Sequence, residues 1–312
     1  ESEHGVFLYD STVRIPWIMA GPGVPAGMHI KQQAREIDLL PTILDLLGGK
    51  ASPAVQGTSM VPAFSGKPVP TTYSYEETLY PKINMGWSEL RGIHTTDWMY
   101  VRAPKPELYD LNQDPGELSN VIDAHPKEYR ELDRQLKILS SGGIENVAAH
   151  QMDQQTMEQL ESLGYVGGAS GENVALNGTG ADPKDRVGIL KIVDATVGHG
   201  AAKLQPSQKI ALLQQGLAED PTNPYLYYTL GDQYKEIGQY GQSLQVYLDA
   251  LHHGVKNGMV LTRLGNLYLN MGNKKEAAAY FQQAAQLGPH NDEAQCNLAN
   301  AYMVDGQGAD AE

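Results

Sequence analysis

The sequence predicts an α/β region that contains a small antiparallel sheet and a helix, followed by an all-helical region built from repeats. Two observations support this division. Up to about residue 185, short apolar runs alternate with breaks that contain glycine and proline, whereas the later residues read as helices throughout. The later part also repeats itself, because Leu230-Gly231 recurs 34 residues further on as Leu264-Gly265.

Composition sets the limits within which these regions are interpreted. The chain has 312 residues, of which 41% are hydrophobic and 19% charged, as in a globular protein of about two domains. Its net charge of -14 argues against nucleic acid as the main partner. No run of 18 apolar residues occurs, so we expect no membrane span in this chain. The single cysteine, Cys296, excludes an internal disulfide.

The first elements are a strand and a helix. Residues 15–20 are almost fully apolar and end at Gly21-Pro22-Gly23, which predicts a buried strand of an α/β sheet. Asp38 suits the N-cap of a helix over residues 39–47, with Pro41 in its first turn. Gly48 would end this helix.

A meander and a covering helix follow. Residues 90–94, 98–102 and 107–111 are three short segments separated by turn-like breaks, which predicts three antiparallel strands. A helix over residues 126–139 should cover one side of them with an apolar face made of Tyr129, Leu132, Leu136 and Leu139. A short helix is expected around residues 156–163, and the glycine-rich residues 166–186 are predicted to be a linker.

The later residues resemble tetratricopeptide (TPR) repeats, in which each repeat is a helical hairpin. The positions that agree across repeats are Leu230, Gly231 and Tyr234, then Leu264, Gly265 and Tyr268, then Leu298, Ala299 and Tyr302, with Tyr247 and Ala250 matching Phe281 and Ala284. We assign about three and a half repeats to residues 187–312, the first of them degenerate. The leucines should be buried within each hairpin, Tyr247 and Phe281 should pack toward the next repeat, and Leu298 and Tyr302 should be unusually exposed.

Residues 1–165 resemble the C-terminal part of sulfatases of the alkaline phosphatase superfamily. The resemblance rests on four segments in order: residues 4–16 with the following Gly21-Pro22-Gly23, residues 37–46, residues 87–91 with Trp98, and residues 107–111 with Asp114-Pro115-Gly116-Glu117 and Asn120. It implies an α/β sulfatase fold and hydrolysis of sulfate esters.

The family chemistry that the resemblance implies needs groups that this chain lacks. Sulfatases oxidise the Cys or Ser of a C/S-x-P-x-R motif to formylglycine and bind a calcium ion through Asp and Asn side chains. No such motif occurs here, and the family's Asp-His metal motif would precede Glu1. We therefore expect the formylglycine and every calcium ligand to lie outside this chain, with no metal ligand inside it, and we expect the chain as given to be inactive.

Three residues are candidates for the site. His4 matches the family position, a Lys or His before Gly, that contacts the sulfate or the leaving-group oxygen, and a histidine could also donate a proton there. The alternative is a surface histidine on a loop. Trp87 and Arg91 are weaker candidates for substrate binding, with packing or turn roles as their alternative.

Three readings of function remain open. The leading one is a sulfuric ester hydrolase whose TPR groove binds a protein partner, with a sulfate ester as substrate. The second is a phosphoryl or phosphonate hydrolase of the same superfamily. The third is a non-catalytic interaction protein in which the repeats are the working part. The resemblance also implies an extracytoplasmic location.

Overall fold

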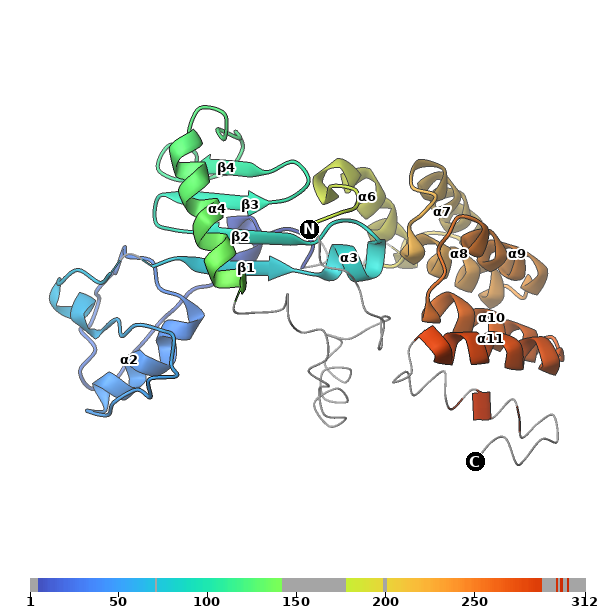
Figure 1. Cartoon of the computed structure of the whole chain (residues 1–312), viewed down its shortest axis with the longest axis horizontal. Helices are drawn as coiled ribbons and strands as arrows, with labels where there is room; N and C mark the ends of the chain where they lie inside the picture. The colour runs from blue at the N-terminus through green and yellow to red at the C-terminus, as the bar shows by residue number, and fades with distance from the viewer. Residues whose placement is uncertain are drawn as a thin grey trace. The chain divides into compact units, whose positions relative to one another are not determined.

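The computed structural model describes most of the chain, and Figure 1 shows it. The residues that it describes are 5–70, 72–141, 178–198 and 201–287, together with 296, 298, 299 and 302. The predicted helix around residues 156–163 and most of the predicted linker lie outside these residues.

The chain divides into two compact units whose boundary does not follow the sulfatase-like and repeat regions of the sequence. One unit comprises Phe7–Glu77 and Leu90–Gly143. The other comprises Glu1–Val6, Thr78–Glu89 and Ile144–Glu312. The prediction kept all of residues 1–165 apart from the repeats, whereas Thr78–Glu89 belongs to the same unit as the repeats.

A four-stranded sheet forms the centre of the first unit, in the order β1-β2-β3-β4 (Figure 1). Its strands are β1 (Ser74–Thr78), β2 (Leu90–His94), β3 (Trp98–Arg102) and β4 (Glu107–Asp110). The last three pair antiparallel, which confirms the predicted meander. The sequence did not predict β1, because its residues Ser-Tyr-Glu-Glu-Thr are mostly polar and show no clear apolar alternation.

The two faces of the sheet carry separate cores, as the two-residue period of a strand requires. One face buries Ile93, Tyr100 and Leu108 against Leu132 and Leu136 of helix α4 (Pro126–Ser141). The helix is the predicted one, and it lies across the sheet in Figure 1. Leu139, which the sequence placed on the covering face, is instead 43% exposed.

The opposite face of the sheet has its own apolar cluster. It buries Leu90, Met99, Val101 and Tyr109 together with Leu8, which comes from the segment before helix α1 (Asp10–Val13). The N-terminal segment thus forms part of the core of this unit.

The buried strand predicted over residues 15–20 is wrong. The structure has no strand there, and Ile15 and Ile18 are 66% and 89% exposed. A single apolar run becomes a strand only when a neighbouring strand satisfies its N–H and C=O groups, and no described residue pairs with it. The run is apolar, as the prediction required, but no strand among the described residues lies beside it.

The predicted helix over residues 39–47 is confirmed as α2 (Leu39–Leu46), after a 3-10 turn at Glu36–Asp38. Asp38 is the residue before α2, but its side chain does not cap it. The buried carboxylate instead accepts hydrogen bonds from the Arg35 side chain at 2.8 and 3.1 Å and from the Thr58 N–H at 2.7 Å. Although burial alone would raise it, these donors hold the pKa of Asp38 below its usual value. A second 3-10 turn, Val61–Ser65, follows.

Helical hairpins make up the repeat region. They are α6 (Val187–Thr196) with α7 (Pro206–Glu219), α8 (Pro224–Glu236) with α9 (Tyr240–His252), and α10 (Gly258–Asn270) with α11 (Lys274–Leu287). The turns Pro183–Arg186 and Ala201–Lys203 precede α6 and α7. Leu230 and Leu264 are buried as predicted, and Leu298 and Tyr302 are partly exposed.

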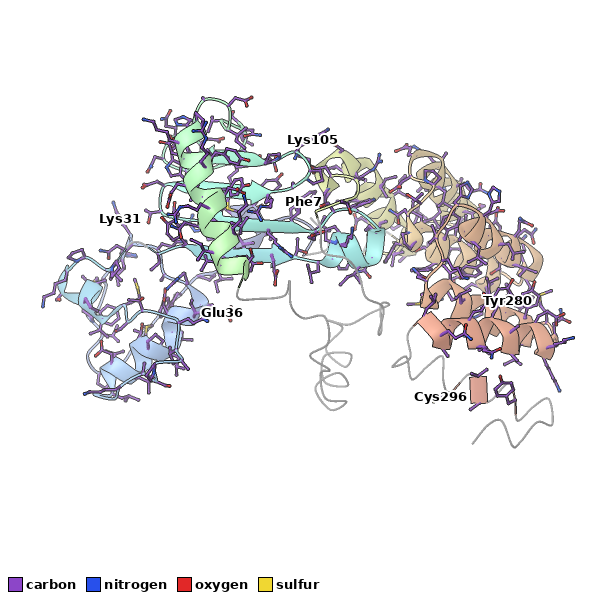
Figure 2. All side chains as sticks on the ribbon, viewed as in Figure 1. Phe7, Lys31, Glu36, Lys105, Tyr280 and Cys296 are labelled. Carbon is purple, nitrogen blue, oxygen red and sulfur yellow. The ribbon has the colours of Figure 1, made fainter. Side chains whose placement is uncertain are left out.

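Aromatic side chains pack on the small residues within each hairpin. A Cβ placed on Gly231 would overlap the ring of Tyr247, and one on Gly265 would overlap Phe281. Both rings therefore lie on a glycine of their own hairpin, in addition to any contact with the next repeat that the sequence led us to expect. Tyr280 of α11, labelled in Figure 2, belongs to an aromatic pair. Its ring stacks on that of Tyr268 of α10, with ring centres 5.4 Å apart.

Candidate functional site

His4 is the residue of the sulfatase-like region for which the sequence predicts contact with the substrate, and residues 5–10 follow it directly. His4 lies outside the described residues, so its role stays a prediction. The next residue, Gly5, has a φ of 109°, which favours glycine, and its carbonyl accepts a hydrogen bond from the Thr78 hydroxyl. Val6 is buried at 2% exposure. The backbone immediately after His4 is therefore fixed.

Tyr9 and Asp10 attach the next part of this segment to the meander. The Tyr9 hydroxyl donates to Glu107 at 3.2 Å, and Tyr109 donates to the other oxygen of that carboxylate at 2.9 Å. The Asp10 N–H, at the start of α1, donates to Glu117 Oε2 at 2.8 Å. The bonds made by Tyr9 and Asp10 connect residues 98 and 107 positions apart and fix the position of the N-terminal segment on the meander.

Glu117 belongs to the Asp-Pro-Gly-Glu segment that is part of the resemblance to sulfatases. Among the described residues other than glycine, only Glu117 has a positive φ, at 52°. The turn is built by Asp114, whose carboxylate accepts the N–H groups of Leu118 and Ser119 at 2.7 and 2.8 Å. Asn120 accepts the Leu108 N–H at 3.0 Å. This motif therefore holds the end of the meander and directs Glu117 toward α1.

Asp10 lies in an acidic cluster that the sequence did not predict. His94 Nε2 lies 3.3 Å from Asp10 Oδ1, and Arg14 lies 3.5 Å from its other oxygen. Burial, together with the charge of Asp10, raises the pKa of both Glu76 and Glu117 to about 7. Burial lowers the pKa of His94, although Asp10 opposes the shift. Asp10 lies within residues 4–16, one of the segments of the resemblance, so the sequence could have pointed to it. Nothing in the sequence pointed to Glu76.

This cluster gives no reason to place a metal ion in it. Across the residues in view, no group of three or more His, Cys, Asp or Glu side chains is arranged to hold a metal. The calcium ion that the resemblance implies therefore has no ligand set among these residues. Carboxyls with a pKa near 7 can instead hold or release protons close to neutral pH.

Trp87 lies in the repeat unit rather than on an open surface. It is 1% exposed and packs in the core formed by α6, α7 and α8, next to Met85. Its indole Nε1–H donates to the buried Asp220 at 2.6 Å. This burial favours the packing role that the sequence left open beside substrate binding.

Arg91 is buried within the sheet. It is 6% exposed and lies opposite Arg102 in the pairing of β2 with β3. Arg102 donates to Asp133 of α4 at 2.7 Å, on the face that α4 covers. Arg91 thus also favours a packing role, in a different unit from Trp87.

A pocket of about 460 Å³ lies along the repeat helices. Helix α8 contributes Tyr225, Tyr228 and Asp232, and α10 contributes Arg263. The Arg263 guanidinium is paired with Asp232 and lies 5.5 Å from the centre of the Tyr228 ring. The wall of the pocket carries hydroxyl, amide and charged groups.

Comparison with known proteins accounts for both parts of the chain. Residues 3–141 match the family model described as N-sulphoglucosamine sulphohydrolase, C-terminal. Residues 212–245 and 259–291 match models of the tetratricopeptide repeat. The chain therefore carries a sulfatase C-terminal region followed by TPR repeats, as predicted.

Particular relatives are sulfatases. The chain is 26% identical over 174 residues to arylsulfatase K of Homo sapiens, covering 50% of this chain and 31% of the relative. It is 31% identical over 129 residues to the Delta 4,5-hexuronate-2-O-sulfatase of Bacteroides thetaiotaomicron, covering 37% of this chain and 26% of the relative. The chain thus spans less than a third of the length of these relatives.

Solved structures resemble the repeat region. A crystal structure of MamA has a TM-score of 0.35 at 21% identity and covers 39% of this chain and 70% of that one. YrrB, a TPR protein with an unusual peptide-binding site, has a TM-score of 0.34 at 22% identity and covers 41% and 62%.

Within the described ranges, no helix combines the length and the apolar character needed to cross a membrane.

Proposed function

We propose that the complete protein is a sulfuric ester hydrolase that carries a TPR protein-interaction module. The observation that carries the proposal is the match of residues 3–141 to the C-terminal region of a sulphohydrolase, together with relatives named as sulfatases. The formylglycine and calcium site belong to the proposal for the complete protein. The extracytoplasmic location expected from the resemblance is part of the same proposal.

We infer that the substrates are sulfated sugars. The matched family is named for N-sulphoglucosamine and the bacterial relative for a hexuronate 2-O-sulfate. Both names describe a sulfate group on a sugar ring, which an ester or sulfamate hydrolase would release as inorganic sulfate.

The fixed loop after His4 supports a role for that residue. A group that contacts the reacting atoms must be held within a fraction of an ångström of its productive position. The hydrogen bonds from Thr78 to Gly5 and from Asp10 to Glu117 restrain the backbone on the C-terminal side of His4. In the complete protein, His4 would contact the sulfate or donate a proton to the leaving alcohol.

The test is release of sulfate from sulfated mono- and disaccharides by the complete protein, measured with and without calcium. His4→Ala should lower kcat/KM by about 100-fold, the usual scale for a general acid or a charge-stabilising donor. His29→Ala, an exposed histidine of the same region, is the matched control and should leave kcat/KM unchanged.

Three other results would change the conclusion. Turnover of phosphate or phosphonate esters, with no release of sulfate, would support the second reading. A complete protein with no hydrolytic activity and an intact TPR pocket would support the non-catalytic reading. A His4→Ala variant with unchanged kcat/KM would return His4 to a surface role.

A further inference from the structure

The segment Thr78–Glu89 packs as part of the repeat region although it comes from the sulfatase-like part of the sequence. Met85 and Trp87 are each 1% exposed within the core that also holds Ile189, Leu213 and Leu226. The segment therefore contributes to the core of the repeats, because the burial of side chains of this size stabilises the folded state.

Hydrogen bonds reinforce this packing on two sides. Besides the bond from Trp87 to Asp220, the Ser88 N–H donates to the Ala181 carbonyl at 2.9 Å, and Lys82 Nζ donates to the Thr179 carbonyl at 2.7 Å. Any side chain at Gly180 would overlap the backbone of Trp87. The chain before α6 and the segment Thr78–Glu89 thus fit closely against each other.

Helix α3 (Tyr80–Met85), which lies in this segment, supplies part of the wall of the repeat pocket. Ile83 and Asn84 line it together with Tyr225, Tyr228 and Arg263. The pocket volume of about 460 Å³ lies within the range of roughly 300–1,000 Å³ found for ligand sites. The remaining lining residues come from the repeats and the turns between them.

The chemistry of the wall favours an uncharged ligand with many hydrogen-bonding groups. Two cations, Lys209 and Arg263, and two anions, Asp232 and Glu236, line the pocket, so their formal charges cancel. Asn84 lines the pocket and donates from its amide nitrogen to the Tyr80 carbonyl at 3.3 Å, and an amide side chain also carries an acceptor oxygen.

An extended peptide fits these features better than a sugar chain. The backbone of a peptide offers donors and acceptors in regular alternation, which amide and hydroxyl side chains can pair. A sugar ring is usually held on an open aromatic face. The Arg263 guanidinium lies 5.5 Å from the centre of the Tyr228 ring, so one face of this ring is covered by a cation.

We propose that the pocket is a composite peptide-binding site, in which α3 of the sulfatase-like region forms one wall and the repeats form the others. The ligand is an extended peptide segment without net charge. The proposal rests on the proposed TPR partner function and adds the contribution of Ile83 and Asn84. Because α3 lies between β1 and β2 in the chain, a bound peptide would contact a segment that leads directly into the sheet of the sulfatase-like region.

The test is selection of displayed random peptides on the complete chain, followed by titration of one selected synthetic peptide by fluorescence polarisation. Asn84→Ala should weaken binding by about 2- to 13-fold, the equivalent of one hydrogen bond. Ile83→Ala should weaken it comparably, and Arg263→Ala more strongly. Gln242→Ala, an exposed residue of α9 outside the pocket lining, is the control and should leave the affinity unchanged.

Other measurements separate this proposal from the TPR function on which it rests. Affinity for an uncharged peptide should change by less than about threefold between about 0.05 and 0.5 M salt. Binding that responds to Arg263→Ala but not to Asn84→Ala or Ile83→Ala would keep the TPR function and overturn the composite site. Failure to select any peptide would overturn both. A sulfated oligosaccharide that displaces the selected peptide from the pocket and binds more tightly than it would overturn the peptide assignment.

Discussion

The contact between Gly231 and Tyr247 can be tested by replacing the glycine with alanine. A Cβ at Gly231 would lie 2.6 Å from the hydroxyl oxygen and 2.7 Å from Cε2 of Tyr247, whereas ordinary contacts are 3.4–4 Å. The ring is 1% exposed and its hydroxyl donates to Asp232 at 3.1 Å, so it cannot turn aside without losing that bond. Overpacking costs about 1–3 kcal/mol, and alanine recovers up to about 1 kcal/mol through its better helix propensity. We expect Gly231→Ala to lower the free energy of unfolding by up to about 2 kcal/mol, and to be about 1–3 kcal/mol less stable than a helical Gly→Ala change without the overlap.

Urea unfolding followed by circular dichroism at about 222 nm measures this change, and hydrogen exchange in α8 and α9 locates it. The control is Gly241→Ala in the same hairpin, because Gly241 is helical and no atom lies within 4 Å of the position that its Cβ would take. That variant should be neutral or more stable by up to about 1 kcal/mol. Adding Tyr247→Leu to Gly231→Ala should restore part of the loss. If Gly231→Ala is as stable as Gly241→Ala, the close contact does not fix the hairpin.

Three further predictions concern buried polar groups. The pKa of Glu76 is about 7 in the folded protein, whereas its usual value is 4.5, so the stability of the fold should fall as the pH rises between these values. Glu76→Gln should therefore have a higher melting temperature than wild type at about pH 8 but not at about pH 4. The pKa of Asp38 is lowered in the folded protein, so its ionised carboxylate stabilises the fold at neutral pH and this stabilisation is lost as the pH falls through the folded pKa. Asp38→Asn should lower the free energy of unfolding, measured with a chemical denaturant, by about 1.5–3 kcal/mol at about pH 7 and by less at about pH 3. Trp87→Phe should destabilise the repeats by about 1.5–3 kcal/mol, and a double-mutant cycle with Asp220→Asn should be less than additive, whereas full additivity would mean that the indole bond contributes nothing.

The repeat helices could be predicted from the sequence because their evidence is local and recurs. Gly231 and Gly265 are the residues on which Tyr247 and Phe281 lie, and both pairs are visible as matching positions. The period also extends to residues that sequence analysis did not use. Asn223 and Asn257 are 34 residues apart, and each accepts the N–H of the residue three positions later at the start of its helix.

The sheet was predicted less completely because its edge depends on tertiary contacts. The meander has apolar positions that alternate along each strand, so its sequence is informative. Strand β1 has only polar and aromatic residues, and it becomes a strand by pairing with β2. Residues 15–20 show the reverse case, in which apolar composition alone predicted a strand but no partner is present among the described residues.

The candidate site was predicted only as far as motifs reach. The segment of residues 114–117 was recognised as part of the resemblance to sulfatases. Its role depends on Glu117, whose carboxylate accepts the N–H of Asp10 from the N-terminal end of the region. Spacing in sequence cannot show a contact between residues 107 positions apart. The same holds for Glu76 and His94, which come close to Asp10 only after the sheet has formed.

Residues 87–91, one of the segments that carry the resemblance to sulfatases, have two separate structural roles. Trp87, Ser88 and Glu89 bind the repeat unit, through Asp220, through the Ala181 carbonyl and through the Gly178 N–H at 2.8 Å. Arg91 instead belongs to β2 and is buried in the sheet. A sulfatase region without repeats would have to cover the Trp87 indole and satisfy its N–H in another way, since an unpaired buried donor costs about 1–3 kcal/mol. The repeats are therefore not an appended module joined only by a linker, because the first of them are built around a segment that the sulfatase-like region supplies.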